Sequence, residues 1–393
     1  MKTNRAIKQG ISRRSFISAG AAATWMLGQP GIATAGRKCN GTVIVVGAGP
    51  AGMAAAHLLK QNGVDFQVLE AAPSVGGRIK HNLDFTDFPI PLGAEWVHGE
   101  PEILEEIVND PAVEITTRLG SYEPGVKSAY FEDGVLEMYF DSAFQSDLKF
   151  IDSSWLQFFS RYILPGILDR ITYNSQVMAI DYSGERIQVT DAAGTIRSAD
   201  KVVVTAPIKI LQRSDIDFIP ALPESKTRVI ENAKIWSGLK VFLEFDHQFY
   251  PTFLSFSDSE TRDGQRLYYD AAYGQYTTKN ILGLFAVGMQ AERYQALSDK
   301  DLLQQILREL DEVFDGVATR SYLQHVVQNW NDDPYAGAAY LADVEDLSTS
   351  RVLSKSVDER VYFAGEAYTN FDDWGGVHAA TRSAADAVNE LLS

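Results

Sequence analysis

Short runs of consecutive apolar residues alternate along this chain with segments whose apolar residues recur at helical spacing. The runs cover residues 42–46, 64–69, 201–205 and 361–363. Uninterrupted apolar runs of this length are typical of strands buried on both faces. Helical spacing occurs in residues 50–62, 299–314 and the segment after Gly376. Strands that alternate with helices in this way predict an α/β fold with a parallel sheet.

The middle of the chain departs from this alternation. Residues 100–165 contain helical patterns and little glycine. Residues 177–207 read as strand, strand, turn and strand, with turns at Ser183-Gly184 and Ala193-Gly194. A further strand is predicted in "SGLKVFLEF", residues 237–245. These segments predict a second lobe with both helices and strands.

The first 35 residues have the pattern of an export signal. They carry five basic residues and no acid, and the apolar stretch 16–28 leads to the small-residue site "ATA" that ends at Ala35. The segment "SRRSFI" resembles a twin-arginine signal. We therefore expect export to the periplasm after cleavage near Ala35; a frayed basic N-terminus is the alternative. The lone cysteine, Cys39, allows no internal disulfide, as expected of a protein that is exported already folded.

Composition narrows the classes of partner. The 393 residues are 45% hydrophobic, enough for two or three lobes, and no apolar run is long enough to span a membrane. The formal net charge is −17, and about −22 without the first 35 residues. Nucleic acid is an unfavourable partner for such a chain. An acidic surface favours small cationic molecules by electrostatic steering, or it simply keeps the protein soluble.

The strongest motif follows the first apolar run. Gly47, Gly49 and Gly52 form G-x-G-x-x-G between a strand and a helix, and Glu70 ends the next strand eighteen residues later. This arrangement predicts a dinucleotide site in which glycines admit a pyrophosphate to the helix N-terminus and the acid accepts ribose hydroxyls. Glu70 argues against a 2′-phosphate, which leaves FAD or NAD. Gly77 and Arg78, just after the acid, resemble the pattern of FAD proteins.

The motifs in order resemble the flavin-containing amine oxidase family, which includes monoamine and polyamine oxidases. They are "GAGPAG", Glu70, "GGR", "LGAEWVHG", "KVFLEF", "NWNDDPYAGAAY" and "FAGEA…GGVHAATRSA". The resemblance implies a discontinuous Rossmann-like domain with non-covalent FAD, in residues 40–83, 166–211 and 346–393. It places a substrate-binding lobe in residues 84–165 and 212–345.

The resemblance also implies roles for individual residues. Lys240 is expected to hold a water near flavin N5 and Trp330 to pack beside the flavin ring; the alternatives are a surface lysine and a core tryptophan. The expected FAD contacts are Gly47, Gly49, Pro50, Ala51, Gly52, Glu70, Gly77, Arg78, Gly93, Ala94, Glu95, Trp96, Val177, Trp330, Gly365, Glu366, Gly376 and Val377. No metal ligand is predicted.

The substrate side is expected to accept a cationic amine. His98 resembles the polyamine-oxidising branch, and Glu95, Glu100 and Glu102 are expected to join it in an acidic mouth, unless this segment is an ordinary solvated loop. Gly376 stands where relatives carry an aromatic residue near Val377. Asp373, Trp374 and Gly376 are therefore expected at the lip of the substrate site, with Trp374 as a displaced ring.

The implied reaction is amine oxidation to an imine by hydride transfer to flavin N5, followed by hydrolysis and reoxidation by oxygen to give hydrogen peroxide. No membrane anchor is expected. The alternatives are a dehydrogenase that passes electrons to a periplasmic carrier, an FAD desaturase or protoporphyrinogen-type oxidase, and a flavin-bound protein without turnover. The sequence does not fix the amine or the oligomeric state.

Overall fold

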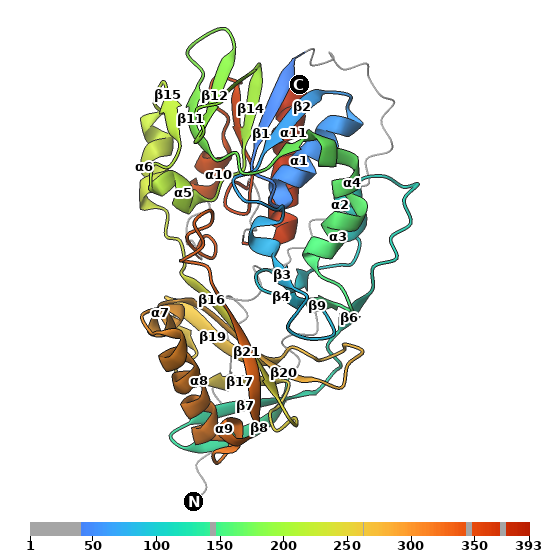
Figure 1. Cartoon of the computed structure of the whole chain (residues 1–393), viewed down its shortest axis with the longest axis vertical. Coiled ribbons are helices and arrows are strands. Elements are labelled where there is room, and N and C mark those ends of the chain that lie inside the picture. Colours follow the sequence, from blue (N-terminus) through green and yellow to red (C-terminus); the bar gives the residue numbers. More distant parts are fainter. Residues whose placement is uncertain (1–40, 142–146, 262, 343–347, 370–374) are drawn as a thin grey trace, which may run out of the picture.

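The computed structural model arranges the chain in two lobes, one above the other in Figure 1. The described residues are 41–141, 147–261, 263–342, 348–369 and 375–393. The predicted export signal, Asp373 and Trp374 lie outside them. No helix of the described ranges combines the length and the apolar character needed to cross a bilayer.

A parallel sheet forms the centre of the upper lobe. In the described chain it has five strands in the order β10 (Ile171–Thr172), β2 (Asp65–Leu69), β1 (Thr42–Val46), β14 (Lys201–Val204) and β22 (Val361–Phe363). Successive side chains of a strand point to opposite faces of the sheet, and both faces of this sheet are buried. Val43 and Val45 enter the core on one face, and Ile44 and Val46 enter the core on the other.

Helices cover one face of this sheet. Helices α1 (Pro50–Gln61) and α11 (Val377–Leu392) pack on each other and on the sheet. The same core takes in α2 (Ile103–Val108), α3 (Trp155–Tyr162) and α4 (Leu164–Ile167). The sequence assigned residues 84–165 to the substrate lobe, and the structure differs at α2 and α3 because their apolar residues join the core of the upper lobe, where α2 contacts α11 and α3 contacts α4.

A smaller sheet covers the other face. Its order among the described strands is β13 (Ile196–Ala199), β12 (Ile187–Asp191), β11 (Val177–Asp181) and β15 (Asp217–Ile219). The helices of this layer are α5 (Ile208–Gln212), α6 (Glu224–Asn232) and α10 (Ser348–Ser354). Strand β15 pairs with β11, and Ile230 of α6 enters the same core. These elements therefore lie with the upper lobe, although residues 212–345 were expected in the substrate lobe.

The lower lobe is one large sheet with helices on one face. Its described strands run in the order β21 (Tyr322–Asn329), β16 (Gly238–Phe245), β20 (Asn280–Gly288), β19 (Gly264–Asp270), β17 (Phe253–Phe256), β7 (Val126–Glu132) and β8 (Val135–Asp141), and β18 (Glu260–Thr261) pairs with β19. The helices are α7 (Met289–Gln295), α8 (Asp299–Val313) and α9 (Val317–Ser321). Leu302, Ile306 and Leu310 of α8 are buried against this sheet, as their helical spacing predicted.

Short elements connect the two lobes. They are the helical turn η1 (Gly77–Ile79) and the strands β3 (His81–Asn82), β4 (Ile90–Pro91), β5 (Val97–His98), β6 (Leu119–Ser121) and β9 (Asp147–Phe150). The helical turn η2 (Leu168–Arg170) lies in the upper lobe, where it contacts β2 and α4. The helical reading of residues 100–165 is thus wrong over β6 to β9. The missed signal is Asp133-Gly134, which turns the β7–β8 hairpin with both residues at positive φ.

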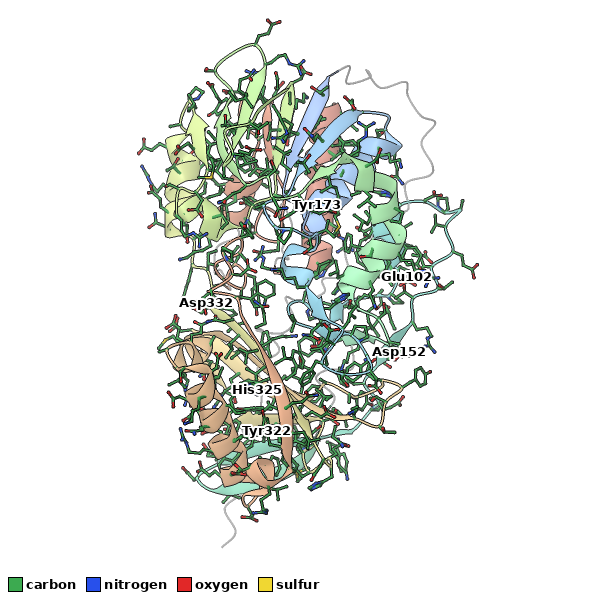
Figure 2. All side chains as sticks on the ribbon, in the orientation of Figure 1. Glu102, Asp152, Tyr173, Tyr322, His325 and Asp332 are labelled. Carbon is green, nitrogen blue, oxygen red and sulfur yellow. The ribbon has the colours of Figure 1, made fainter. Side chains whose placement is uncertain are left out.

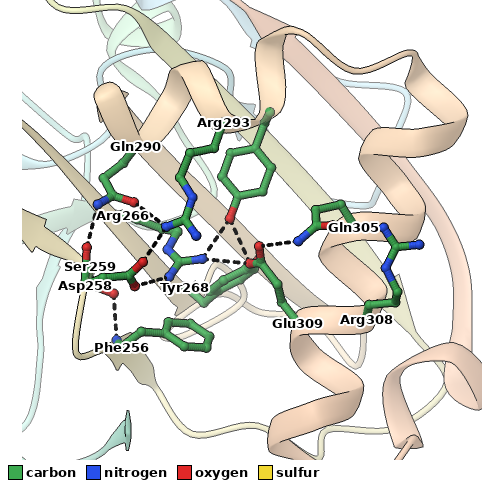
Figure 3. Close-up of polar contacts among 11 residues, drawn as sticks. Phe256, Asp258, Ser259, Arg266, Tyr268, Gln290, Arg293, Gln305, Arg308 and Glu309 are labelled. Atoms are coloured by element: carbon green, nitrogen blue, oxygen red, sulfur yellow. Dashed lines mark hydrogen bonds and ion pairs between the residues drawn. The ribbon is translucent and has the colours of Figure 1, made fainter. Parts of the chain in front are cut away.

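A buried arginine ties the lower sheet to its helices. Arg266 of β19 is 4% exposed, and its guanidinium donates to Asp258 at 2.6 Å and to Glu309 of α8 at 2.9 Å (Figure 3). Tyr268 and Tyr294 also donate to Glu309. This network places a paired charge where the lobe is otherwise apolar.

Removing that charge should destabilise the protein far more than removing a neighbouring surface charge. We expect Arg266→Met to cost about 3–5 kcal/mol, because the Glu309 carboxylate, whose side chain is only 12% exposed, loses its counter-charge. Arg293 contacts the same Asp258 but its side chain is 44% exposed, so Arg293→Met should cost less than about 1 kcal/mol. Urea unfolding followed by circular dichroism measures both, and equal losses would contradict the assignment.

Candidate active site

Residues of both lobes line one large cavity of about 1290 Å³. That exceeds the roughly 300–1,000 Å³ of sites for drug-sized ligands. The predicted site residues among its lining are Gly47, Gly49, Pro50, Ala51, Glu70, Gly77, Arg78, Gly93, Ala94, Glu95, Trp96, His98, Val177, Lys240, Trp330, Gly365, Glu366, Gly376 and Val377. Segments far apart in sequence therefore meet at one place.

The glycines of the first motif have separate structural reasons. Gly47 has φ of +103°, a turn conformation that other residues rarely adopt. A Cβ on Gly52 would lie 2.0 Å from the carbonyl oxygen of Gly47, so Gly52 lets α1 pack against β1 without lining the cavity. Around Gly49, no atom of the described residues lies within 4 Å of a Cβ position, and the space there belongs to the cavity.

Glu70 is held firmly at the end of β2. One carboxylate oxygen accepts the backbone N–H of Ala48 at 2.5 Å and the other accepts that of Ala72 at 2.8 Å. Burial raises the pKa of Glu70 in spite of these two hydrogen bonds. The carboxylate is thus oriented toward the cavity beside the N-terminus of α1, as expected of a ribose acceptor.

Arg78 and Glu366 meet at the cavity wall. The guanidinium of Arg78 lies 3.0 Å from Glu366 and also donates to the carbonyl of Ala339. The second oxygen of Glu366 accepts the N–H of Leu341. This pair joins the segment after β2, the segment after β22 and the end of the "NWNDDPYAGAAY" motif.

Trp330 is fixed beside Gly93. Its indole N–H donates to the carbonyl of Leu92 at 3.0 Å, and the ring is 4% exposed. A Cβ on Gly93 would lie 2.9 Å from this ring and 1.8 Å from the carbonyl oxygen of Arg78. The glycine therefore lets the chain pass between the tryptophan and the backbone of Arg78.

Lys240 is buried in a cluster of charges, not exposed on the sheet. Its ammonium lies 2.8 Å from Glu95, which also accepts the hydroxyl of Tyr269 and lies 3.5 Å from Lys149. Lys240 also stands 5.2 Å from the ring centre of Trp96. Both lysines are buried, but of the two only Lys240 lines the cavity among the described residues.

The charges of this cluster shift one another's ionisation. Burial, the largest influence, lowers the pKa of the Lys240 ammonium, and the Glu95 carboxylate opposes that shift. Burial alone would raise the pKa of Glu95, but Lys240, Lys149 and Tyr269 hold it below its ordinary value. Glu95 is therefore an ionised partner of the lysines and stands inside the cavity, away from the acidic mouth where the sequence also placed it.

His378 explains the glycine before Val377. A Cβ on Gly376 would lie 2.3 Å from the imidazole of His378, so only glycine leaves the ring its place at the start of α11. The ring centres of His378 and His98 are 6.2 Å apart. His98 contacts Asp147 at 2.9 Å, and all three side chains line the cavity. A histidine thus occupies the space in which the sequence suggested a missing aromatic wall.

Carboxylates gather where the cavity opens. Glu100, Glu102 and Glu106 are exposed and line it, and Glu106 is paired with Arg382 at 2.8 Å. Figure 2 shows Glu102 at the level where the two lobes meet. The structure thus brings Glu100 and Glu102 to the cavity wall, together with Glu106, and the acidic mouth stays a prediction.

Sequence reasoning missed several residues of this cavity. The rings of Tyr340 and Trp236 meet edge to face with centres 5.8 Å apart, and Tyr340 lies 3.4 Å from a Cβ position on Gly375. Tyr340 is the last residue of the motif "NWNDDPYAGAAY", and His378 directly follows Val377, so the sequence near both residues could have indicated them. Trp236, Asp147 and the nearby Lys149 had no such local signal, because only strand pairing brings them here.

The cavity fits a flavin dinucleotide on geometric grounds. A Cβ on Gly77 would lie 3.4 Å from the Cα of Gly49, so two bare backbones face each other beside the N-terminus of α1. Such a cradle suits a pyrophosphate, and Glu70 lies where a ribose would follow. The far end has the flat walls of Trp330 and Trp96. The described residues contain no group of three or more His, Cys, Asp or Glu side chains able to hold a metal ion.

Comparisons with known proteins agree with this geometry. A family model described as flavin containing amine oxidoreductase matches residues 163–392, and one described as NAD(P)-binding Rossmann-like domain matches residues 45–110. Polyamine oxidase 4 of rice is 24% identical, over 90% of this chain and 89% of its own length. Mouse lysine-specific histone demethylase 1B is 25% identical over 84% of this chain, which spans about half the length of that protein.

Solved structures share the fold. A putrescine oxidase bound to putrescine superposes with a TM-score of 0.73 at 16% identity, over 90% of this chain and 99% of the other. The predicted α/β fold with a Rossmann-like part is confirmed. The family model agrees with the predicted amine oxidase class and with a flavin as the cofactor. Because the amine oxidoreductase match covers more than half of the sequence, the chain belongs to the flavin-containing amine oxidoreductase family.

Proposed function

We propose that this protein is an FAD-dependent oxidase of a small cationic amine, with a polyamine-like substrate. The amine is oxidised to an imine that hydrolyses, and oxygen is reduced to hydrogen peroxide. The observation that carries the proposal is the buried Lys240, which lines the cavity together with Trp330 and Trp96. Relatives named polyamine oxidase and a structural neighbour named putrescine oxidase support the substrate class.

The cavity residues have three separate roles: they bind the cofactor, exclude water and supply a positive charge. The bound flavin supplies the two-electron acceptor for the amine carbon–hydrogen bond. Glu70 and the glycine backbones hold its nucleotide part. Trp330 and Tyr340 give the substrate apolar walls that exclude water and favour the neutral, reactive amine. Lys240 provides a fixed positive charge where negative charge develops on oxygen.

The acidic mouth is the proposed entrance for the substrate. Glu100 and Glu102 attract a cationic amine from solution, and the effect should weaken with salt because both are exposed. The export predicted from residues 1–35 would place this reaction in the periplasm, which cell fractionation of the full chain would test.

One observation favours a second candidate, an amine dehydrogenase that passes electrons to a carrier. Glu95 lies 2.8 Å from Lys240 and offsets part of the charge that oxygen reduction would use. The deciding experiment mixes the holoenzyme anaerobically with a panel of amines, follows bleaching of the flavin absorbance, and then admits air. Bleaching with peroxide supports the oxidase, and bleaching without peroxide supports the dehydrogenase. If no amine bleaches the flavin, amine oxidation is refuted.

Replacing Lys240 should separate the two half-reactions. We expect Lys240→Met to slow reoxidation by oxygen roughly 10²-fold and to change anaerobic reduction by amine far less. Lys149→Met is the matched control, since it removes a buried ammonium beside the same Glu95 without altering the cavity wall. Stopped-flow absorbance measures both rates, and equal slowing of reoxidation by the two variants would reject a direct role for Lys240.

Two alanine substitutions should distinguish cofactor contact from folding. Gly49→Ala adds a methyl group only to the cavity, so we expect an unchanged melting temperature without FAD and a roughly tenfold or larger rise in the FAD dissociation constant. Gly52→Ala forces α1 away from Gly47, so it should lower the melting temperature with and without FAD. Tight FAD binding by the Gly49→Ala protein would contradict the proposed cradle.

A further inference from the structure

The surroundings of Lys240 favour an uncharged amine unless a counter-charge is present. The residue is 3% exposed, and the residues directly opposite it on the two neighbouring strands are the uncharged Phe285 and Gln328. A lysine buried without a counter-charge can have a pKa of about 5–6, so it is neutral at neutral pH. The positive charge that the proposed oxidation needs therefore depends on what pairs with Lys240.

Glu95 supplies that counter-charge from the segment between β4 and β5. One of its carboxylate oxygens lies 2.8 Å from the Lys240 ammonium, and both side chains are 4% exposed. The ammonium also donates to the carbonyl of Pro91 at 3.3 Å. Among the described residues, Glu95 is the one carboxylate that pairs with Lys240. The charge state of Lys240 thus depends mainly on a single residue.

Two further side chains contact the same carboxylate from other strands. Lys149 of β9 lies 3.5 Å from the other Glu95 oxygen, and the hydroxyl of Tyr269 of β19 donates to Glu95. Lys149 is a like charge for Lys240, so it disfavours the ammonium form of Lys240 while it stabilises the ionised Glu95. Tyr269 stays uncharged, because burial raises its pKa well above the ordinary value. Glu95 and Lys149 therefore act on Lys240 in opposite directions, and Tyr269 is a neutral contact.

The oxygen half-reaction is the step that needs a positive charge. The anionic reduced flavin, oxygen and one proton from solvent give oxidised flavin and hydrogen peroxide, and negative charge develops on oxygen as the electrons arrive. A fixed cation in a dry site stabilises that charge. Glu95 weakens the field of Lys240 by its own negative charge, but without Glu95 the buried group would carry no charge at neutral pH. A paired ammonium is therefore more useful to oxygen reduction than a neutral amine.

We propose that Glu95 is a positioning residue that keeps Lys240 in its ammonium form and thereby sets the pH range over which the site reduces oxygen. The inference rests on the proposed function and deepens it, because it assigns the pH dependence of one half-reaction to one residue. Glu95 acts through Lys240 and needs no contact with oxygen. Reoxidation should slow as the pH rises through the pKa of Lys240, because only the protonated form supplies the charge.

The first test measures the protonation of Lys240 directly. Protein labelled with carbon-13 at lysine Cε is titrated by NMR with and without FAD, and the signal that is missing from Lys240→Met identifies the residue. Glu95→Gln keeps the shape of the side chain but removes its charge, so it should lower the pKa of Lys240 by about 1–3 units. Lys149→Met removes a like charge and should raise that pKa. Tyr269→Phe is the matched control, because it removes a hydrogen bond to Glu95 but no charge, and it should shift the pKa far less than Glu95→Gln.

The second test follows the reaction with oxygen. The flavin of the holoenzyme is reduced by light without any amine, mixed with oxygenated buffer from about pH 6 to pH 10, and followed by stopped-flow absorbance. The midpoint at which reoxidation declines should be lowest in Glu95→Gln, higher in wild type and highest in Lys149→Met. At about pH 8 we expect Glu95→Gln to be reoxidised roughly tenfold more slowly than wild type and to regain speed as the pH is lowered.

A double variant keeps the test valid if Glu95→Gln does not fold. The single substitution leaves two buried ammonium groups without their carboxylate, whereas Glu95→Gln/Lys149→Met removes one charge of each sign. Glu95 influences Lys240 more strongly than Lys149 does. The double variant should therefore still show a lower pKa of Lys240, and an earlier decline of reoxidation with pH, than wild type.

Three results would overturn the proposal. They are an unchanged pKa of Lys240 in the variants that lack Glu95, a shifted pKa without a matching shift in the reoxidation profile, and faster reoxidation of Glu95→Gln than of wild type above neutral pH. None of these measurements uses an amine. Failure of every amine to bleach the flavin would thus refute the proposed function and leave the role of Glu95 standing, whereas amine oxidation with no effect of Glu95 would refute only this inference.

Discussion

The ion pair between Lys240 and Glu95 fixes the geometry on which the site depends. Both groups are buried, and a charge left unpaired there would be costly, so the segment between β4 and β5 must lie against β16. Lys149 and Tyr269 complete the cluster from two other strands. With Glu95 held in place, Gly93, Trp96 and His98 of the same short segment are positioned along the cavity.

The second constraint is that separate segments of the backbone approach one another closely, which glycine permits because it has no side chain. Gly52 admits the carbonyl of Gly47, and Gly93 passes between Arg78 and Trp330. Gly376 is a different case, because the space of its missing side chain is filled by the imidazole of His378. That last contact places an imidazole ring in the cavity wall beside Val377.

The polarity of the cavity is divided among its parts. Exposed carboxylates such as Glu100 and Glu102 lie on one part of the wall, tryptophan and tyrosine rings line another, and the buried Lys240 and Glu95 line a third. Each part comes from a different stretch of the chain, and the division is consistent with the proposed oxidation of a cationic amine. The Lys240–Glu95 contact sets how much positive charge remains at the centre.

The sequence by itself determined the parts whose signal is local. Gly47 to Glu70 is a contiguous strand, helix and strand, and its dihedral and packing demands can be read from neighbouring residues. The buried strands, helix α8 and the start of α11 at Gly376 have the same local character. The β6–β9 region was misread as helical, although the turn at Asp133-Gly134 is a local cue that distinguishes the β7–β8 hairpin from helix.

Only the tertiary structure decided which side chains face one another. Lys149 and Trp236 carry no motif. Lys149 reaches Glu95 because β9 pairs with β5, and Trp236 reaches Tyr340 through backbone hydrogen bonds with Tyr340 and Ala339. The packing of α2, α3 and β15 on the upper lobe was equally hidden. The physical reason is the same in each case. Hydrophobic burial and sheet register bring together residues that lie far apart in sequence, and the conformational preferences of neighbouring residues do not specify which distant segments pair.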